Sequence, residues 1–203
     1  MSLFLILLAA GDSKRLESTT PKPFHKINNI TLLEHTINAF NTFSEIKKTV
    51  IVYNKKHKKY LNKLNLKNVL KIIGGKNRQE STFIALRRIK KMNCKKVLIH
   101  DSARPSPPRE LVNKMIYYLR KNHAVIPLIK TNDATKRVRK NKIFKNIDRN
   151  SLRFAQTPQG FTYKKIYNKH QKNINKNFDD DSALFTYDTE KVLVISGSKE
   201  NLK

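Results

Sequence analysis

The sequence predicts an α/β fold, with a mostly parallel sheet flanked by helices and a β-arm that projects from it. Two observations lead to this prediction: short apolar segments alternate with amphipathic ones, and one basic stretch breaks that alternation. The 203 residues, 38% of them hydrophobic, are enough for one well-buried domain. No repeat or linker divides them, so we expect a single domain over residues 1–203.

Six short apolar runs rich in β-branched residues are predicted to be the strands of one sheet. They cover residues 3–8, 49–53, 69–73, 97–100, 124–128 and 192–196. The first run is too short to span a bilayer and lacks the basic flank and cleavage site of a signal peptide. We therefore interpret it as a buried strand, and we expect no membrane partner.

Three segments between these runs repeat apolar residues at helical spacing. They are residues 31–41, 80–92 and 110–121, the last opened by Pro107 and Pro108. Strands that alternate with helices form largely parallel sheets, and ligands of such folds bind beyond the carboxyl ends of the strands. The candidate site is therefore expected where the predicted strands end.

Residues 134–153 interrupt the alternation. This stretch is strongly basic, and its apolar residues, Val138, Ile143, Phe144 and Ile147, are spaced too thinly to form a core helix. We expect a hairpin arm here. An apolar ribbon that projects from a domain needs a covering surface, which predicts a partner for the arm.

Charge and cysteine content limit the class of protein. The formal net charge is +28, which keeps a basic nucleic-acid-binding protein as an alternative. The lysines are spread through nearly every segment rather than clustered, so solvated faces are the favoured interpretation and a nucleic-acid partner is disfavoured. Cys94 is the single cysteine, so no intrachain disulfide can form and a cytoplasmic location is expected.

Glycine is scarce, and its placement is informative. Of five glycines, Gly11 and the pair Gly74 and Gly75 directly follow predicted strands. Glycine lets backbone amides approach phosphate oxygens closely, and Arg15 adds a cation after the first turn. Prolines on both sides of Lys22 stiffen the same loop. Neither a Walker A motif nor GxGxxG fits, so an ordinary strand-to-helix turn remains the alternative.

A second polar cluster, residues 100–105, follows the fourth predicted strand. Asp101 could accept hydrogen bonds from ribose hydroxyls or help to hold a magnesium ion, and Arg104 suits a bidentate contact to phosphate. The alternative is a structural ion pair between these two residues.

Short motifs over nearly the whole chain together resemble one family. In chain order they read LAAGDSKRL, TPKPF, LLEHTINAF, GGKNRQEST, IHDSARP, DRNSLRFAQTPQGF, DDDSAL and GSKENLK. With these motifs the sequence resembles the 2-C-methyl-D-erythritol 4-phosphate cytidylyltransferases of the non-mevalonate isoprenoid pathway. The resemblance implies a Rossmann-like nucleotidyltransferase fold.

The resemblance also implies a reaction and its residues. CMP would pass from CTP to 2-C-methyl-D-erythritol 4-phosphate, giving 4-diphosphocytidyl-2-C-methyl-D-erythritol and pyrophosphate, with Mg²⁺ as cofactor. The implied catalytic residues are Arg15, Lys22 and Lys203. The nucleotide-binding residues would be Ala9, Ala10, Gly11, Gly75, Lys76, Ser81, Asp101 and Ser102, with Asp101 also the metal ligand. The acceptor would be bound by Arg104, Arg149, Thr157 and Lys203. Arg149 would come from the arm of a second subunit, which implies a homodimer.

Three departures from the family pattern leave alternatives open. Ala134 stands where the family usually has Thr, which keeps ribitol-5-phosphate cytidylyltransferase as an alternative. Ser13 replaces a glycine of the first loop, and Lys76 replaces a common acid. The sequence ends at Lys203 where family members continue, so we expect a cut chain, a natural short form, or the cytidylyltransferase part of a bifunctional protein with 2-C-methyl-D-erythritol 2,4-cyclodiphosphate synthase. A catalytically weakened member kept for assembly is a further alternative.

Overall fold

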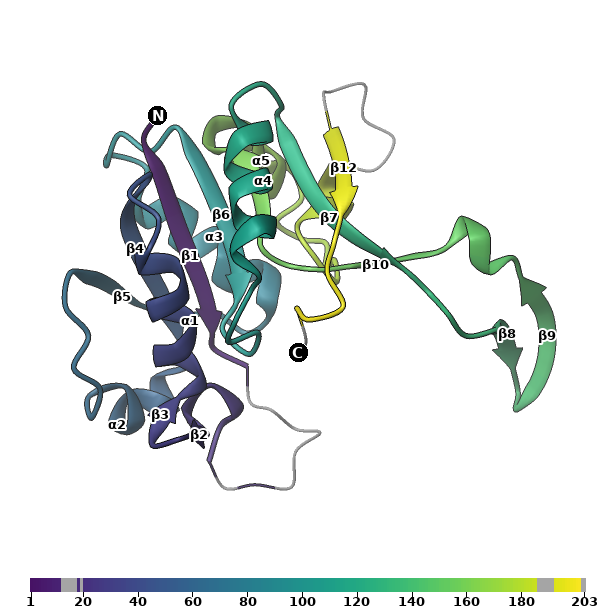
Figure 1. Cartoon of the computed structure of the whole chain (residues 1–203), viewed down its shortest axis with the longest axis horizontal. Coiled ribbons are helices and arrows are strands. Elements are labelled where there is room, and N and C mark those ends of the chain that lie inside the picture. Colours follow the sequence, from purple (N-terminus) through teal and green to yellow (C-terminus); the bar gives the residue numbers. More distant parts are fainter. Residues whose placement is uncertain (12–17, 19, 186–191, 202–203) are drawn as a thin grey trace.

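The computed structural model describes residues 1–11, 18, 20–185 and 192–201. Within this described part, the central sheet has eight strands in the order β10-β7-β11-β6-β1-β4-β5, with β12 also paired to β7 (Figure 1). The strands are β1 Leu3–Ala9, β4 Ile46–Tyr53, β5 Val69–Ile73, β6 Lys96–Asp101, β7 Ala124–Lys130, β10 Arg153–Ala155, β11 Gln159–Thr162 and β12 Val192–Ser196.

Most strand pairs of this sheet are parallel, as predicted. β1 pairs in parallel with β4 and β6, β4 with β5, and β12 with β7. β11 runs antiparallel between β6 and β7, and β10 runs antiparallel to β7. All six predicted strands are present, with ends that differ by up to three residues. The α/β prediction is confirmed.

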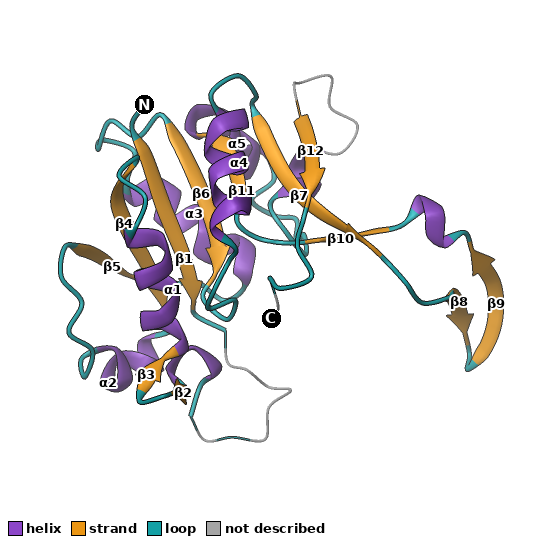
Figure 2. Ribbon diagram, viewed as in Figure 1, coloured by secondary structure: helices purple, strands orange, loops and turns teal. Residues whose placement is uncertain are grey.

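Helices cover both faces of the sheet because the buried residues of β1 alternate. Leu3, Leu5 and Leu7 pack with α1 Leu32–Asn41 and α4 Arg109–Leu119, whereas Phe4 and Ile6 pack with α3 Arg78–Arg88 and α5 Tyr163–Lys172. Figure 2 shows α1 and α4 in front of the strands and α3 and α5 behind them. The body also contains a short helix, α2 Lys58–Leu61, and a two-stranded ribbon, β2 Lys26–Ile27 with β3 Ile30–Thr31.

Capping residues set where two helices begin. The Thr31 hydroxyl accepts from the Glu34 amide at 3.2 Å while the Glu34 carboxylate accepts from the Thr31 amide at 2.9 Å, a capping box at the start of α1. The Asn77 side chain accepts from the Glu80 amide at 2.8 Å. α3 therefore begins at Arg78, two residues before the prediction, and it ends at Arg88, four residues short of it.

The predicted arm is a β-hairpin. β8 Thr135–Arg139 and β9 Lys142–Ile147 pair antiparallel in a sheet of their own, joined by Lys140 and Asn141, which both have positive φ. A short 3₁₀ helix, η3 Arg149–Ser151, follows. Figure 1 shows the hairpin standing away from the body of the molecule. Ile143 is 67% exposed and Phe144 61%, so the apolar ribbon is uncovered in this chain.

The main elements that were not predicted from the sequence are the short antiparallel strands β10 and β11 and the helix α5. Among the described residues, no helix has both the length and the apolar character that crossing a membrane requires.

Candidate active site

The loops that follow β1 and β6 meet at the carboxyl edge of the parallel strands. The Ser102 hydroxyl donates to the Leu8 carbonyl at 2.8 Å, and the Ser102 amide donates to the same oxygen at 3.2 Å. Ser102 is fully buried, and its own carbonyl accepts from the Thr36 hydroxyl of α1 at 3.2 Å. These contacts, with Asp101 opposite Leu8 in the sheet register, bring Asp101 to the start of the loop after β1.

The loop after β5 closes against the same edge. A Cβ added at Gly74 would lie 2.8 Å from Ser81 Oγ and 3.0 Å from the Cβ of Ala10, so only glycine lets the two loops approach this closely. The Gly75 amide donates to Ser81 Oγ at 3.1 Å, and the Lys76 amide donates to the Glu80 carboxylate at 2.6 Å. Gly75, Lys76 and Ser81 therefore lie at the amino end of α3, where backbone amides and the helix dipole favour an anion.

Two arginines flank the Asp101 carboxylate. Arg104 Nε lies 3.9 Å from Oδ2, so the structural ion pair considered from the sequence exists but is longer than a hydrogen bond. Arg78 Nε lies 3.6 Å from Oδ1, and its Nη1 lies 2.6 Å from Asp181. Arg78 Nη2 and Arg104 Nε are buried and have no hydrogen-bond partner among the described residues. Both guanidinium groups keep donor capacity beside Asp101.

Burial and charge act against each other at this cluster. Burial would lower the pKa of Arg78, but Asp181 and Asp101 outweigh it and raise that pKa above its usual value. Burial would likewise raise the pKa of the Asp181 carboxyl, but Arg78 and His170 outweigh it and lower that pKa. Burial lowers the pKa of Arg104, which Asp101 partly offsets. The cluster therefore holds fixed charges at neutral pH.

Thr157 connects the antiparallel part of the sheet to Asp101. Its hydroxyl oxygen accepts from the Asp101 amide at 3.1 Å and lies 3.1 Å from His100 Nδ1, while His100 Nε2 lies 2.9 Å from the Arg104 carbonyl. One proton arrangement satisfies all three contacts: the Thr157 hydroxyl donates to Nδ1, and Nε2 donates to the carbonyl. Burial lowers the pKa of His100 to about 4, so its imidazole is neutral at pH 7.

Lys22 lies at the start of the 3₁₀ turn η1 Lys22–Phe24. Pro21 and Pro23 are buried on either side of it. The buried Phe24 ring stacks on Tyr60 with centroids 5.4 Å apart. The turn is thus anchored in the body of the molecule by the Phe24 ring.

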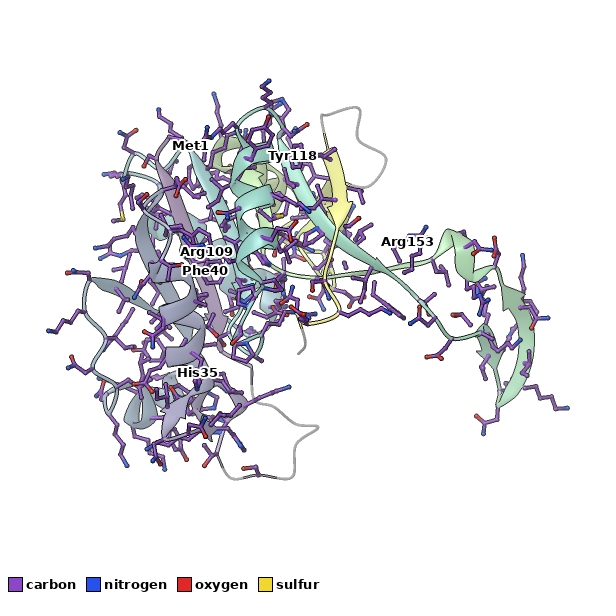
Figure 3. The ribbon with its side chains drawn as sticks, in the orientation of Figure 1. Met1, His35, Phe40, Arg109, Tyr118 and Arg153 are labelled. Carbon is purple, nitrogen blue, oxygen red and sulfur yellow. The ribbon has the colours of Figure 1, made fainter. Side chains whose placement is uncertain are left out.

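Several predicted residues are not among those that the structure brings to the Asp101 cluster. Arg15 and Lys203 lie outside the described residues. Arg149 is exposed on the arm, where its Nη1 donates to the Asn132 carbonyl at 3.1 Å. Figure 3 labels Arg153, four residues further on, at the base of the arm and well apart from Phe40 in the body. The turn η3, which carries Arg149, stands with the arm away from the body of the molecule (Figure 1). Gly11 is described, exposed, with open space around its Cα.

The donor set gives little support to a resident metal ion. Among the residues that the structure describes, no group of three or more His, Cys, Asp or Glu side chains could hold a metal. Asp101 is a single carboxylate between two cations, which weakens its attraction for a dication. A magnesium ion at this edge would need most of its ligands from a bound substrate.

Sequence reasoning missed several residues of the cluster. It gave no role to Arg78, Asp181 or Asn201. The Asn201 amide donates to the Thr157 carbonyl at 2.7 Å, and its own carbonyl accepts from Arg104. The DDDSAL motif was the available signal for Asp181, since three adjacent acids are unusual in so basic a chain.

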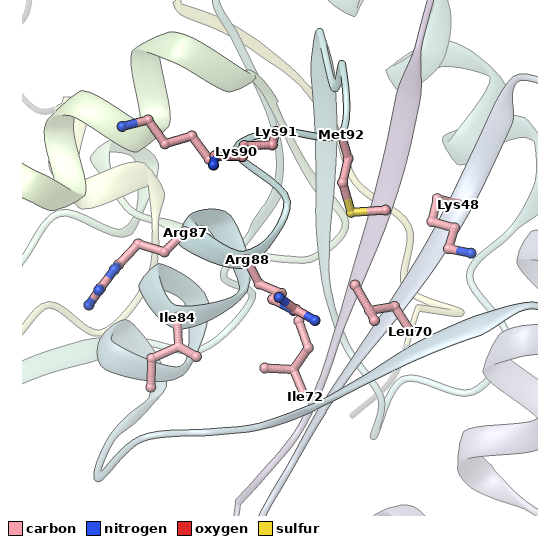
Figure 4. A pocket seen from close by; sticks show the side chains of 9 residues that line it. All are labelled: Lys48, Leu70, Ile72, Ile84, Arg87, Arg88, Lys90, Lys91 and Met92. Carbon is pink, nitrogen blue, oxygen red and sulfur yellow. The ribbon is translucent and has the colours of Figure 1, made fainter.

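A separate groove of about 840 Å³ runs between α3 and the edge strand β5 (Figure 4). Its apolar lining includes Leu70, Ile72 and Ile84, and its rim carries Lys and Arg side chains. None of the predicted site residues lines it. The groove is therefore distinct from the candidate site at the strand ends.

Comparisons with known proteins identify the family of this chain. The family model described as 2-C-methyl-D-erythritol 4-phosphate cytidylyltransferase, IspD, matches residues 3–203. A protein of Pelagibacter ubique named bifunctional enzyme IspD/IspF is 42% identical over the whole chain, which spans 54% of that relative's length. The 2-C-methyl-D-erythritol 4-phosphate cytidylyltransferase of Clostridioides difficile is 32% identical over 98% of this chain and 86% of its own.

A solved structure shares the fold of this chain. The 4-diphosphocytidyl-2C-methyl-D-erythritol synthase of Anaerococcus prevotii superposes with a TM-score of 0.83 and 30% identity, covering all of this chain and 91% of its own. The chain spans about half the length of the Pelagibacter relative but most of the length of the other two. Because one family model covers nearly every residue, the chain belongs to the 2-C-methyl-D-erythritol 4-phosphate cytidylyltransferase family.

Proposed function

We propose that the chain transfers CMP from CTP to 2-C-methyl-D-erythritol 4-phosphate and releases pyrophosphate. The observation that carries the proposal is the convergence of three loops in a member of this family. The loops after β1, β5 and β6 touch through Gly74, Ser81 and Ser102, and they surround Asp101. This is the edge at which α/β sheets bind nucleotides.

In this proposal each loop has its own task. The loop of Gly75 and Lys76, with Ser81 in the first turn of α3, receives the cytosine ring and orients it. The Asp101 carboxylate accepts hydrogen bonds from the ribose hydroxyls. Lys22, held by its buried prolines, supplies positive charge to the triphosphate. Arg15 belongs to the same proposal, although it lies outside the described residues.

The chemistry asks for positioning and charge rather than for a protein base. An oxygen of the acceptor phosphate attacks the α-phosphorus in line, forming one P–O bond while the bond to the bridging oxygen of pyrophosphate breaks. The acceptor phosphate is already ionised at neutral pH, since its second pKa is about 6. Arg104 and Thr157 are proposed to hold it, and Lys203 as well. The cations stabilise the charge that develops during transfer.

Magnesium and a second subunit complete the proposal. Mg²⁺ would arrive with CTP, because the described residues include no group of three or more His, Cys, Asp or Glu side chains that could hold it. The exposed apolar ribbon of the arm supports a homodimer in which Arg149 reaches the acceptor of the other subunit. A cytoplasmic location is proposed because the chain has one cysteine, Cys94, which is buried and free.

The test is pyrophosphate release by the purified protein with CTP, Mg²⁺ and 2-C-methyl-D-erythritol 4-phosphate. Lys22→Ala should lower kcat about a hundredfold or more, the usual cost of losing one charged stabilising group. Lys121→Ala, which removes an exposed lysine after α4, is the matched control and should keep full activity. Equal turnover by Lys22→Ala would refute the assignment of Lys22.

Ribitol 5-phosphate is the second candidate acceptor, because Ala134 stands where a threonine is usual in the family. The two acceptors should be compared at equal concentration, and a higher kcat/KM for ribitol 5-phosphate would transfer the proposal to that reaction. Tight, salt-dependent nucleic-acid binding without any CTP binding would instead favour the nucleic-acid alternative.

A further inference from the structure

Asp181 is a buried carboxylate that the proposed mechanism does not use. Its side chain is 1% exposed, and it lies between the side chains of Arg78 and His170. Oδ2 lies 2.6 Å from Arg78 Nη1, and Oδ1 lies 3.0 Å from His170 Nε2. The His170 ring is also 1% exposed and stacks on Phe83 with an interplanar angle of 4°. Both partners of Asp181 are thus fixed in direction.

Arg78 is held more closely by Asp181 than by Asp101. The 2.6 Å contact is a short charge-assisted hydrogen bond, whereas the 3.6 Å separation from Asp101 Oδ1 is an ion pair without one. The position of the guanidinium is therefore set from the Asp181 side. Asp101, in turn, has a cation at a fixed place beside one of its two oxygens.

The segment that carries Asp181 is docked firmly on the body. Asp180 accepts from the Gln159 amide group at 2.9 Å, and the Ser182 amide donates to the Gln159 carbonyl oxygen Oε1 at 3.1 Å. Gln79 of α3 accepts from the Phe178 amide at 2.8 Å. These contacts tie the segment to β11 and to the same first turn of α3 that carries Arg78.

We propose that Asp181 is a positioning residue for recognition of the nucleotide sugar. Held by His170, it fixes Arg78, and Arg78 orients the Asp101 carboxylate so that its oxygens face the ribose hydroxyls. This inference rests on the proposed function, in which Asp101 binds the ribose. It predicts that loss of the Asp181 charge weakens the protein's ability to distinguish CTP from analogues that lack a ribose hydroxyl.

The experiment measures the dissociation constants of CTP, 2′-deoxyCTP and 3′-deoxyCTP by calorimetry, with magnesium and without acceptor. The wild-type protein should bind CTP at least about tenfold more tightly than one of the analogues, as expected when a hydrogen bond to a charged group is lost. Asp181→Asn should reduce that preference to within about threefold, and Asp101→Asn should do the same. Asp179→Asn removes the same charge from an exposed position two residues away and should keep the preference.

A second variant guards against loss of the fold, because removing one member of a buried ion pair can destabilise it strongly. Arg78→Lys keeps a cation for Asp181 but lacks the planar fork that reaches both carboxylates. It should also lose the preference, with thermal unfolding showing that it is folded. In the Asp101→Asn background, Asp181→Asn should cause no further loss of CTP affinity, because Asp181 acts through Asp101.

The outcomes separate this inference from the proposed function. If folded Asp181→Asn and Arg78→Lys both keep the wild-type preference, the positioning role is wrong whatever the turnover. If the wild-type protein binds CTP and both analogues equally, Asp101 does not bind the ribose and the inference falls, while cytidylyl transfer stands on its own assay. If the wild-type protein prefers CTP over the deoxy analogues, and the variants lose that preference, but no pyrophosphate is released, the positioning role is supported and the proposed reaction is refuted.

Discussion

Lowering the pH from 7 to 5 should destabilise the fold through His100. Its ring is completely buried, with Phe40 at an edge-on centroid distance of 4.9 Å, and both ring nitrogens are engaged by Thr157 and the Arg104 carbonyl. Burial is the largest influence on its pKa and lowers it from 6.5 to about 4, against the hydrogen bond to the Arg104 carbonyl and the nearby Asp101, which raise it. The imidazole is thus held neutral in the folded protein.

The magnitude follows from the two pKa values. The unfolded chain takes up a proton at His100 near pH 6.5, whereas the folded protein does so only near pH 4. Between these values the unfolded state binds more protons, so the stability present above pH 6.5 is lost as the pH falls. Integration over pH 7 to 5 gives a loss of about 2 kcal/mol. Carboxyl groups with ordinary pKa values near 4 have hardly begun to titrate at pH 5.

Urea unfolding followed by circular dichroism measures this loss, with His100→Gln as the comparison. Glutamine can still donate and accept near Thr157, but it does not titrate. Other ionisable groups are common to both proteins, so the difference between their pH profiles isolates His100. The variant should be less stable at pH 7 and should lose about 2 kcal/mol less between pH 7 and 5. Parallel profiles for the two proteins would refute the reasoning.

Three further predictions concern the loops and the arm. Gly74→Ala should raise the KM for CTP about tenfold in steady-state assays, because the new Cβ would lie 3.0 Å from the Cβ of Ala10 and force the loops apart; an unchanged KM would contradict this. Phe24→Ala should lower the free energy of unfolding by about 3 kcal/mol through lost packing on Tyr60, and lower kcat with it; undiminished kcat would show that the turn does not depend on its anchor. Phe144→Lys should weaken self-association at least tenfold in analytical ultracentrifugation, since the Phe144 ring is 61% exposed on the arm. An unaltered dissociation constant of the dimer would exclude this part of the arm as the dimer interface.

The strands and helices predicted from periodicity are present because local patterns specify them. The missed strand β11 has only four residues, too few for a clear pattern. Its Gly160 lets α4 pack closely on it, because a Cβ there would lie 3.1 Å from Leu119 and 3.2 Å from Met115. α5 does have a helical pattern, with Tyr163, Ile166 and His170 buried on one face. The pattern is hard to recognise because one of its buried members is a histidine, whose burial depends on contacts with Asp181 and Phe83.

The candidate site divides in the same way. Gly74, Gly75, Asp101 and Ser102 could be predicted because each lies at or just beyond the end of a strand, where the fold places ligands. Arg78 could not, since its role depends on Asp181, 103 residues further along the chain. The sequence indicates which edge of the sheet binds a ligand, whereas the charges that orient the site come from segments folded against it.

Only a few residues of chain separate the arm from the candidate site. β10 ends at Ala155, and two residues later the Thr157 hydroxyl contacts His100 and the Asp101 amide. Gln156 is buried between them and donates to the Ser198 carbonyl at 2.8 Å. Covering the arm and filling the nucleotide site therefore act on one continuous stretch of backbone. If both events favour the same backbone position, they are thermodynamically coupled. Nucleotide binding then raises the affinity of self-association by the same factor by which self-association raises the affinity for nucleotide.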